Sequence, residues 1–195
     1  DSNEESIKTI DKVKDLISDK VLEFRRSEFV GPTISSELLW TGLQAIGFSL
    51  IAILIYIWLR FEWQFGFGAV VALTHDVIFT LGFLSLFNID FSLSSIAAIL
   101  TIAGYSINDS VVIFDRIREN LRKYKKLDLP DLFNLSINNT LSRTIMTSLS
   151  TLIALACLYI FGGQVIKPFA IAMIIGVIIG TYSSIFVAVP TLLLF

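Results

Sequence analysis

Gly104-Tyr-Ser-Ile-Asn-Asp-Ser-Val-Val-Ile-Phe-Asp-Arg-Ile-Arg-Glu-Asn120 is the stretch that decides the fold. It starts inside an apolar run, carries the carboxylate of Asp109 into that run, and ends in basic and polar residues. An ionised aspartate in the middle of a membrane helix opposes insertion by roughly 2.5–3.5 kcal/mol. We therefore expect Asp109 to be paired with a cation, hydrated or protonated during function, and the rest of the chain to supply its partners.

The composition places the chain among polytopic membrane proteins. Hydrophobic residues make up 54% of the 195 residues and charged residues only 16%, which is far from the balance of a soluble domain. The net charge of −2 argues against a nucleic-acid-binding surface. The single cysteine, Cys157, excludes an intrachain disulfide and is expected to be an ordinary small residue of an apolar run. Because the chain begins with Asp1 and no leader-like segment, we expect it to be processed or to be part of a longer protein.

We expect two parts, residues 1–36 and residues 37–195. In the first part, apolar residues at helical spacing predict an amphipathic helix from Glu4 to Asp19. Residues 21–30 predict a strand, which Gly31-Pro32 would end. One helix and one strand cannot bury a core of their own, so this part is predicted to be the C-terminal remnant of a larger soluble α+β domain.

The second part contains five apolar runs, each long enough to cross a hydrocarbon core of about 30 Å as a helix. We place these membrane helices at residues 38–59, 65–87, 92–114, 141–161 and 168–195. Residues 127–140 contain Pro130 and an apolar–polar pattern, which predicts a separate helix lying at the membrane interface. Gly176 and Gly180 form a small-xxx-small motif that predicts close helix packing in the last span.

Basic residues predict the orientation of the membrane helices. Arg60 lies between the first two spans, and six more basic residues lie between the third and fourth: Arg116, Arg118, Arg122, Lys123, Lys125 and Lys126. The positive-inside rule places both connections in the cytoplasm. The loop 115–140 is therefore predicted to be cytoplasmic, and the N-terminal soluble part is predicted to lie on the outer side of the membrane. Trp40, Trp58 and Trp63 suit interface positions.

Four ionisable side chains fall at membrane depth: His75, Asp76, Asp109 and Arg143. Groups at that depth usually mark ion or proton routes, or else act as polar contacts between helices worth about 0.6 kcal/mol each. For Asp109 and Arg143 we favour a role in proton coupling. For His75 and Asp76 a structural hydrogen bond between the two explains the pair equally well.

Polar and small residues follow Asp109 and Arg143 at helical spacing. The stripe near Asp109 contains Thr101, Tyr105 and Asn108, with Gly104 thinning the helix beside it, and the stripe after Arg143 contains Thr147, Ser150, Thr151 and Ala154. Two such stripes facing each other would enclose a polar seam that carries an acid and a base. Arg143 favours the ionised form of Asp109 and burial disfavours it, so movement of Arg143 would let Asp109 take up a proton. His75, Asp76, Tyr105 and Asn108 form a candidate secondary polar site.

Several kinds of site are not predicted. His75 has no further ligands at metal spacing beyond Asp76, so no metal site is expected. The chain has no glycine-rich phosphate loop, and we expect no cofactor. Asp76 and Asp109 could be mistaken for an aspartyl-protease dyad. Asp109, however, follows Ser-Ile-Asn rather than Gly-x-Gly, and Asp76 follows a histidine rather than a tyrosine, so no catalytic residue is predicted.

The motifs resemble the SecF family of the bacterial Sec protein-export machinery. The resemblance covers the chain from residue 28 onward and rests on Val30-Gly-Pro32, Ser36-Glu-Leu38, Arg60-Phe-Glu-Trp63, His75-Asp76, Ser142-Arg-Thr144 and above all the stretch from Gly104 to Asn120. It implies an RND-type helix bundle with a periplasmic ferredoxin-like α+β domain, of which residues 1–36 would be the end. The first membrane helix and most of that domain would lie outside this sequence.

The same resemblance implies a function. Members of this family sit in the bacterial inner membrane and are not enzymes. With SecD, and alongside the SecYEG channel, they are thought to use the proton motive force in late steps of the export of unfolded polypeptides. The family's membrane carboxylate and arginine, implicated in proton movement, correspond to Asp109 and Arg143. A proton-driven RND-type exporter of small molecules or lipids is the alternative, because it shares this machinery and differs in the outward domain.

Overall fold

The computed structural model describes residue 12, residues 32–89 and residues 93–195. The chain divides into two units, Asp1–Thr41 and Gly42–Phe195. The predicted helix from Glu4 to Asp19 and the predicted strand at residues 21–30 lie outside the described residues, apart from Lys12, which is helical.

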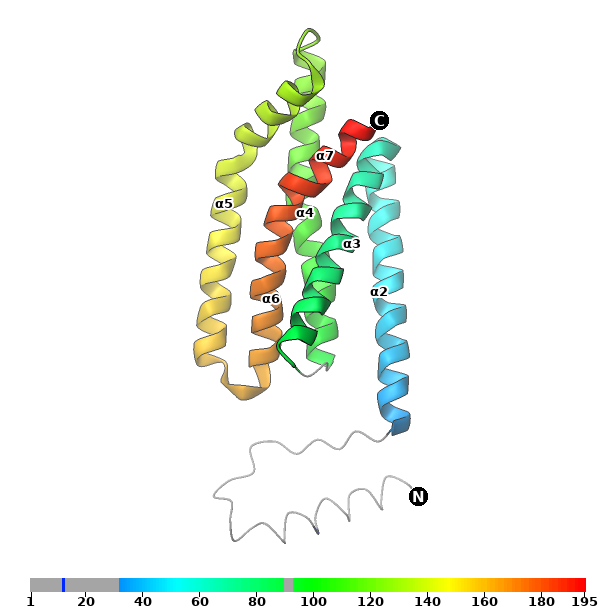
Figure 1. Ribbon diagram of the computed structural model, residues 1–195, viewed down its shortest axis with the longest axis vertical. Helices are drawn as coiled ribbons and strands as arrows, with labels where there is room; N and C mark the ends of the chain where they lie inside the picture. The colour runs from blue at the N-terminus through cyan, green and yellow to red at the C-terminus, as the bar shows by residue number, and fades with distance from the viewer. Residues whose placement is uncertain (1–11, 13–31, 90–92) are drawn as a thin grey trace. The chain divides into compact units, whose positions relative to one another are not determined.

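The described part of the chain is built from five long helices (Figure 1). These are α2 (Pro32–Arg60), α3 (Trp63–Leu86), α4 (Leu93–Lys123), α5 (Leu129–Phe161) and α6 (Gly163–Ser183). The chain then continues through a π-helical turn, η2 (Ser184–Ala188), the short α7 (Val189–Thr191) and a 3₁₀ turn, η3 (Leu192–Leu194). Within residues 32–89 and 93–195, five segments are long and apolar enough to cross a membrane: Trp40–Arg60, Trp63–Leu86, Ser94–Lys123, Leu129–Phe161 and Val165–Leu194. The five predicted spans are thereby confirmed as apolar helices.

Two helices are longer than their apolar runs. Helix α4 continues past residue 114 to Lys123, and within its polar end Arg116 Nη1 donates to Glu119 Oε2 at 2.6 Å. Helix α5 begins at Leu129 rather than at residue 141. The prediction of a separate interfacial helix at residues 127–140 is therefore wrong. Pro130 stands in the first turn of α5, where its missing N–H would have no helical partner.

Helix α6 contacts α3, α4 and α5 within the unit formed by residues 42–195 (Figure 1). Its closest approach is to α4, at the two glycines of the small-xxx-small motif. A Cβ atom on Gly176 would lie 2.2 Å from Ile102 Cδ1, and a Cβ atom on Gly180 would lie 3.1 Å from the Cβ of Ser106. The motif thus packs two helix backbones closely together, as the sequence predicts.

Buried side chains form three layers along these helices. An apolar cluster lies toward the α4–α5 connection and includes Phe65, Phe114, Leu132 and Ala188. A second apolar cluster lies toward the opposite helix ends and includes Leu84, Ile102, Leu155 and Val177. In sequence between these two clusters, each helix from α3 to α6 carries buried polar residues, which we call the polar layer: Asp76, Thr80, Ser106, Asp109, Ser110, Thr144, Ser148, Ser183 and, at the start of η2, Ser184.

Helix α5 curves near its N-terminal end (Figure 1). Ser136 Oγ donates to the carbonyl of Leu132 at 2.8 Å, and Thr140 Oγ1 donates to the carbonyl of Ser136 at 3.1 Å. Hydroxyls that bond to the carbonyl one turn earlier bend a helix. At this place α5 is also joined to α4, because Asn120 Nδ2 donates to Ser136 Oγ at 2.8 Å.

Candidate functional site

The polar layer contains two carboxylates on neighbouring helices. Asp76 in α3 is fully buried, and Asp109 in α4 is 4% exposed. Burying an ionised carboxylate is costly unless it is paired or hydrogen-bonded. The two groups differ in how far this requirement is met.

Both carboxylate oxygens of Asp76 have partners. His75 Nδ1 lies 3.0 Å from Asp76 Oδ1, and Ser106 Oγ donates to Asp76 Oδ2 at 2.5 Å. The ring of His75 also packs on Phe79, with 4.4 Å between ring centroids. Asp76 therefore joins α3 to α4, and its surroundings are those of a satisfied contact between helices.

Asp109 is less well satisfied. Its Oδ2 atom is buried and has no hydrogen-bond partner in the part of the chain that the structure describes. The guanidinium of Arg143, on α5, lies within electrostatic reach of this carboxyl group. Arg143 itself is exposed, and no direct ion pair joins the two side chains among the described residues. The arrangement is a buried acid with a nearby cation that does not touch it.

Tyr105 and Asn108 do not join His75 and Asp76 in a single site. Tyr105 packs beside the second apolar cluster, and its hydroxyl has no hydrogen-bond partner among the described residues. Asn108 is exposed. Each precedes a buried residue of α4 by one position, which turns its side chain by about 100° around the helix. The hydrogen bonds of Asp76 go instead to His75 and Ser106.

The buried polar face of α5 differs from the predicted one. In the expected stripe, Arg143, Ser150 and Ala154 are exposed, and Thr147 and Thr151 are half-buried. The buried face carries Ser136, Thr140, Thr144 and Ser148, one helical turn apart. Ser148 Oγ lies 2.7 Å from Thr181 Oγ1 of α6. The predicted stripe was wrong by one step around the helix, although the four-residue repeat of hydroxyls is visible in the sequence.

Several buried atoms of the polar layer lack a hydrogen-bond partner among the described residues: Thr80 Oγ1, Asp109 Oδ2, Thr144 Oγ1 and Ser183 Oγ. Buried polar groups are nearly always paired, so their concentration in one layer calls for an explanation. No group of three or more histidine, cysteine, aspartate or glutamate side chains that could hold a metal ion occurs within residues 32–89 and 93–195.

The fold and this layer define a class of protein, a multi-pass α-helical membrane protein with acidic and basic groups at membrane depth. The family model described as "Protein export membrane protein SecD/SecF, C-terminal" matches residues 9–195. The chain belongs to this family.

Curated relatives and solved structures agree with this assignment. The chain is 52% identical to the protein translocase subunit SecF of Rickettsia rickettsii and 51% identical to that of Rickettsia bellii, and all of the chain is aligned in both cases. It spans 64% and 65% of the length of these relatives.

The crystal structure of SecDF, a translocon-associated membrane protein from Thermus thermophilus, matches 94% of the chain with a TM-score of 0.88 and 43% identity. SecDF in its super-membrane-facing form matches 96% of the chain with a TM-score of 0.78 and 38% identity. The chain covers 26% of each of these longer chains. The arrangement of the apolar helices is therefore that of a SecDF membrane region.

Proposed function

We propose that this chain is the greater part of the membrane domain of a SecF-type subunit, an auxiliary component of the Sec protein translocase. Together with SecD, it would couple the proton motive force to late steps of polypeptide export across the bacterial inner membrane. The family match over residues 9–195 and the SecF relatives at about half identity support this proposal.

The observation that supports the coupling mechanism is that the Asp109 side chain is buried and incompletely hydrogen-bonded. Oδ2 of the buried Asp109 carboxyl group has no hydrogen-bond partner among the described residues. In general, a carboxyl group is easier to bury once it takes up a proton, and a neighbouring cation favours its ionised form. A change in the distance between the two groups would therefore load or release a proton. Each proton that crosses 100 mV supplies about 2.3 kcal/mol, so several protons would drive one large domain movement.

The hydroxyls of the polar layer that have no hydrogen-bond partner among the described residues suit a proton route. Thr80, Thr144 and Ser183 lie in the same layer of the bundle, on α3, α5 and α6. Polar groups at membrane depth that face a bundle interior are typical of ion and proton paths. Asp76 differs because both of its oxygens are already bound, and we assign it and His75 to holding α3 against α4.

We propose that SecD covers the face of the bundle that carries Arg143. Arg143 and Asn108 are exposed in this chain at membrane depth, where polar side chains need protein or water beside them. SecYEG and the unfolded substrate would be further contacts of the assembly. We place residues 115–140, which include the end of α4 and the start of α5, in the cytoplasm, and residues 1–36, as the end of a ferredoxin-like domain, in the periplasm. The bundle would be of the RND type and would carry no catalytic residue.

The test is gradient-dependent completion of export by the full-length subunit in proteoliposomes with its translocase partners. Asp109→Asn and Arg143→Ala are expected to abolish the part of export that requires the proton gradient and to leave the ATP-driven part intact. Asp131→Asn and Lys126→Ala remove one charge each from exposed positions outside the polar layer and serve as matched controls. Full gradient-dependent export by Asp109→Asn would contradict the proposed coupling.

A further inference from the structure

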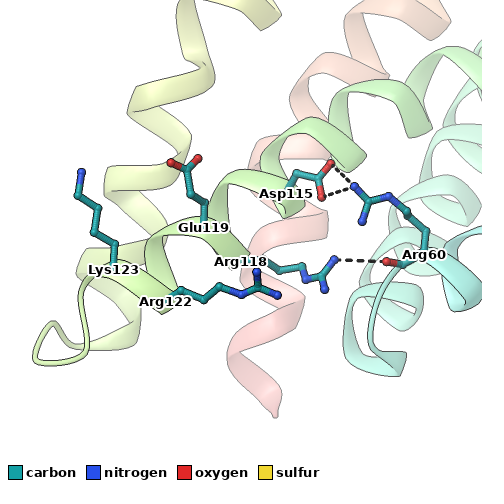
Figure 2. Close-up of a pocket in the computed structure, with 6 residues that line it drawn as sticks. All are labelled: Arg60, Asp115, Arg118, Glu119, Arg122 and Lys123. Atoms are coloured by element: carbon teal, nitrogen blue, oxygen red, sulfur yellow. Dashed lines mark hydrogen bonds and ion pairs between the residues drawn. The ribbon is translucent and has the colours of Figure 1, made fainter.

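An open pocket lies at the end of the bundle that carries the α4–α5 connection (Figure 2). It has a volume of about 520 Å³ and is lined by Arg60, Asp115, Arg118, Glu119, Arg122 and Lys123. Arg60 is the last residue of α2, and the other five belong to the last turns of α4. Four cations against two carboxylates give these six residues a net charge of +2.

Two of the cations are held in place by the protein. Arg60 Nη2 lies 3.1 Å and 3.2 Å from the two carboxylate oxygens of Asp115. Arg118 Nη1 donates to the backbone carbonyl of Arg60 at 3.3 Å. Both guanidinium groups also lie over the ring of Phe61, at 5.1 Å and 5.4 Å from its centroid. A guanidinium has five N–H donors, so each keeps donors for a further ligand after these contacts.

Arg122 completes the basic side of the pocket. Its side chain extends toward Arg118 and Arg60, whereas Glu119 and Lys123 extend away from Arg60 (Figure 2). Glu119 is engaged by Arg116, and no ion pair is formed by Arg122 within the described part of the chain. Three guanidinium groups thus meet on one side of the pocket, with only one carboxylate among them. Planar guanidinium forks of this kind suit phosphate oxygens.

The pocket lies at the depth of the lipid headgroups. Arg60 ends one apolar span and Trp63 begins the next, so the turn between them marks the membrane boundary. Trp58 and Trp63, on either side of Arg60, are 65% and 57% exposed. Exposed tryptophans are enriched at the membrane–water interface, level with the headgroups.

An apolar crevice of about 100 Å³ begins one turn further along α2, at Ile57, in the direction away from the end of the bundle. Among its lining residues are Ile57 of α2 and Ile107 of α4. Ile57 lies about one helical turn before Arg60 on α2, and Ile107 lies about two turns before Asp115 on α4. A ligand with an anionic head and an apolar tail would have polar partners in the pocket and apolar partners in the crevice, whereas a free phosphate ion would use only the pocket.

We propose that this end of the bundle binds an anionic phospholipid, with the headgroup phosphate held by Arg60, Arg118 and Arg122 in the pocket and the start of an acyl chain in the apolar crevice. Basic pockets between membrane helices are a recurrent way of holding anionic lipid headgroups. A general attraction of the basic loop to a negative membrane surface would require neither guanidinium groups held in place nor an apolar crevice. Both features therefore favour a specific lipid site.

The test uses the full-length subunit in nanodiscs, with Trp40 and any tryptophan outside residues 1–195 replaced by phenylalanine to limit the signal to Trp58 and Trp63. The probe is phosphatidylglycerol with brominated acyl chains, which quenches nearby tryptophan fluorescence, and brominated phosphatidylcholine is the reference. We expect the anionic lipid to quench more strongly at equal content. The double variant Arg118→Gln with Arg122→Gln should lower its apparent affinity about tenfold.

Two further variants separate a site from a general charge effect. Lys125→Gln with Lys126→Gln removes the same charge from the same connection outside the pocket and should leave the preference unchanged. Glu119→Gln adds one unit of charge to the pocket and should strengthen the preference, an outcome that misfolding cannot mimic. Equal quenching by the two lipids in the parent protein, or equal losses in the two double variants, would overturn the proposal.

Inorganic phosphate tests whether the pocket binds a free phosphate ion rather than a lipid headgroup. Titration of the detergent-solubilised subunit with phosphate is expected to give no binding that depends on Arg118 and Arg122. Phosphate binding with that dependence, without enrichment of the anionic lipid, would identify a site for free phosphate and refute the lipid.

Discussion

Replacing Gly176 by alanine tests whether close contact between α4 and α6 holds the helix that carries Asp109. The added Cβ atom would lie 2.2 Å from Ile102 Cδ1 and 2.3 Å from its Cγ1. Favourable carbon–carbon contacts lie at about 3.5–4.0 Å, so Ile102 must move by more than an ångström. Ile102 is 1% exposed and belongs to the second apolar cluster, so it must move against other buried side chains.

The expected cost follows from this overlap. Overpacking of a tight core costs about 1–3 kcal/mol, and the better helix propensity of alanine returns up to about 1 kcal/mol. We therefore expect Gly176→Ala to destabilise the subunit by about 1–2 kcal/mol. Gly180→Ala should cost less, because its Cβ would lie 3.1 Å from that of Ser106. Gly104→Ala should be neutral or stabilising, because nothing lies within 4 Å of the added atom.

The assay is thermal unfolding of the purified full-length subunit in detergent, followed by a double-mutant cycle with Ile102→Ala. That substitution by itself should cost about 2–5 kcal/mol through the cavity it leaves. Combined with Gly176→Ala it should cost less than the sum, with a coupling of about 0.5–3 kcal/mol, because the new methyl group enters the space that isoleucine vacated. The packing argument fails if Gly176→Ala is as stable as Gly104→Ala, or if the two losses simply add.

Two further predictions concern buried hydrogen bonds and use the same melting assay. Ser106→Ala removes the hydrogen-bond donor to Asp76 Oδ2, which is fully buried, and should destabilise the subunit by about 1–3 kcal/mol. Ser150→Ala is the control. It removes an exposed hydroxyl that bonds only to its own helix and should change stability by less than about 0.5 kcal/mol. Similar melting temperatures for the two would contradict the role given to Ser106. Ser136→Ala removes the acceptor of the Asn120 side-chain amide and should lower the stability of the subunit by about 1–2 kcal/mol. The double variant with Asn120→Leu should recover part of that lost stability. Unchanged stability of Ser136→Ala would show that this contact does not join α4 to α5.

Hydropathy identified the membrane helices because their apolar runs are long enough to span a bilayer. It could not place the ends of α4 and α5, because beyond the bilayer a helix is held by pairs such as Arg116–Glu119 and Asn120–Ser136 rather than by apolar character. Hydropathy responds to the lipid boundary, while the backbone continues for as long as its hydrogen bonds and side-chain contacts allow.

Asp76 and Asp109 could be identified from the sequence as candidates because charged residues are rare in apolar runs. Ser106, the donor to Asp76, could not be identified in this way, because a single serine in a membrane helix is common and only the register of α4 against α3 brings it to that carboxylate. The buried face of α5 was missed for a similar reason. The prediction assumed that the face of α5 carrying Arg143 is buried. In the structure Arg143 is exposed, and the hydroxyls of Thr144 and Ser148 are buried instead.

The bond between Asn120 and Ser136 makes one end of the α4–α5 pair a pivot. Ser136 precedes Arg143 by two turns of α5, a lever arm of about 10 Å along the helix axis. A tilt of roughly ten degrees about that point would shift the backbone at Arg143 by about 2 Å. Small angular changes between the two helices would thus be converted into separation of the guanidinium from the Asp109 carboxyl, while the loop end stayed closed.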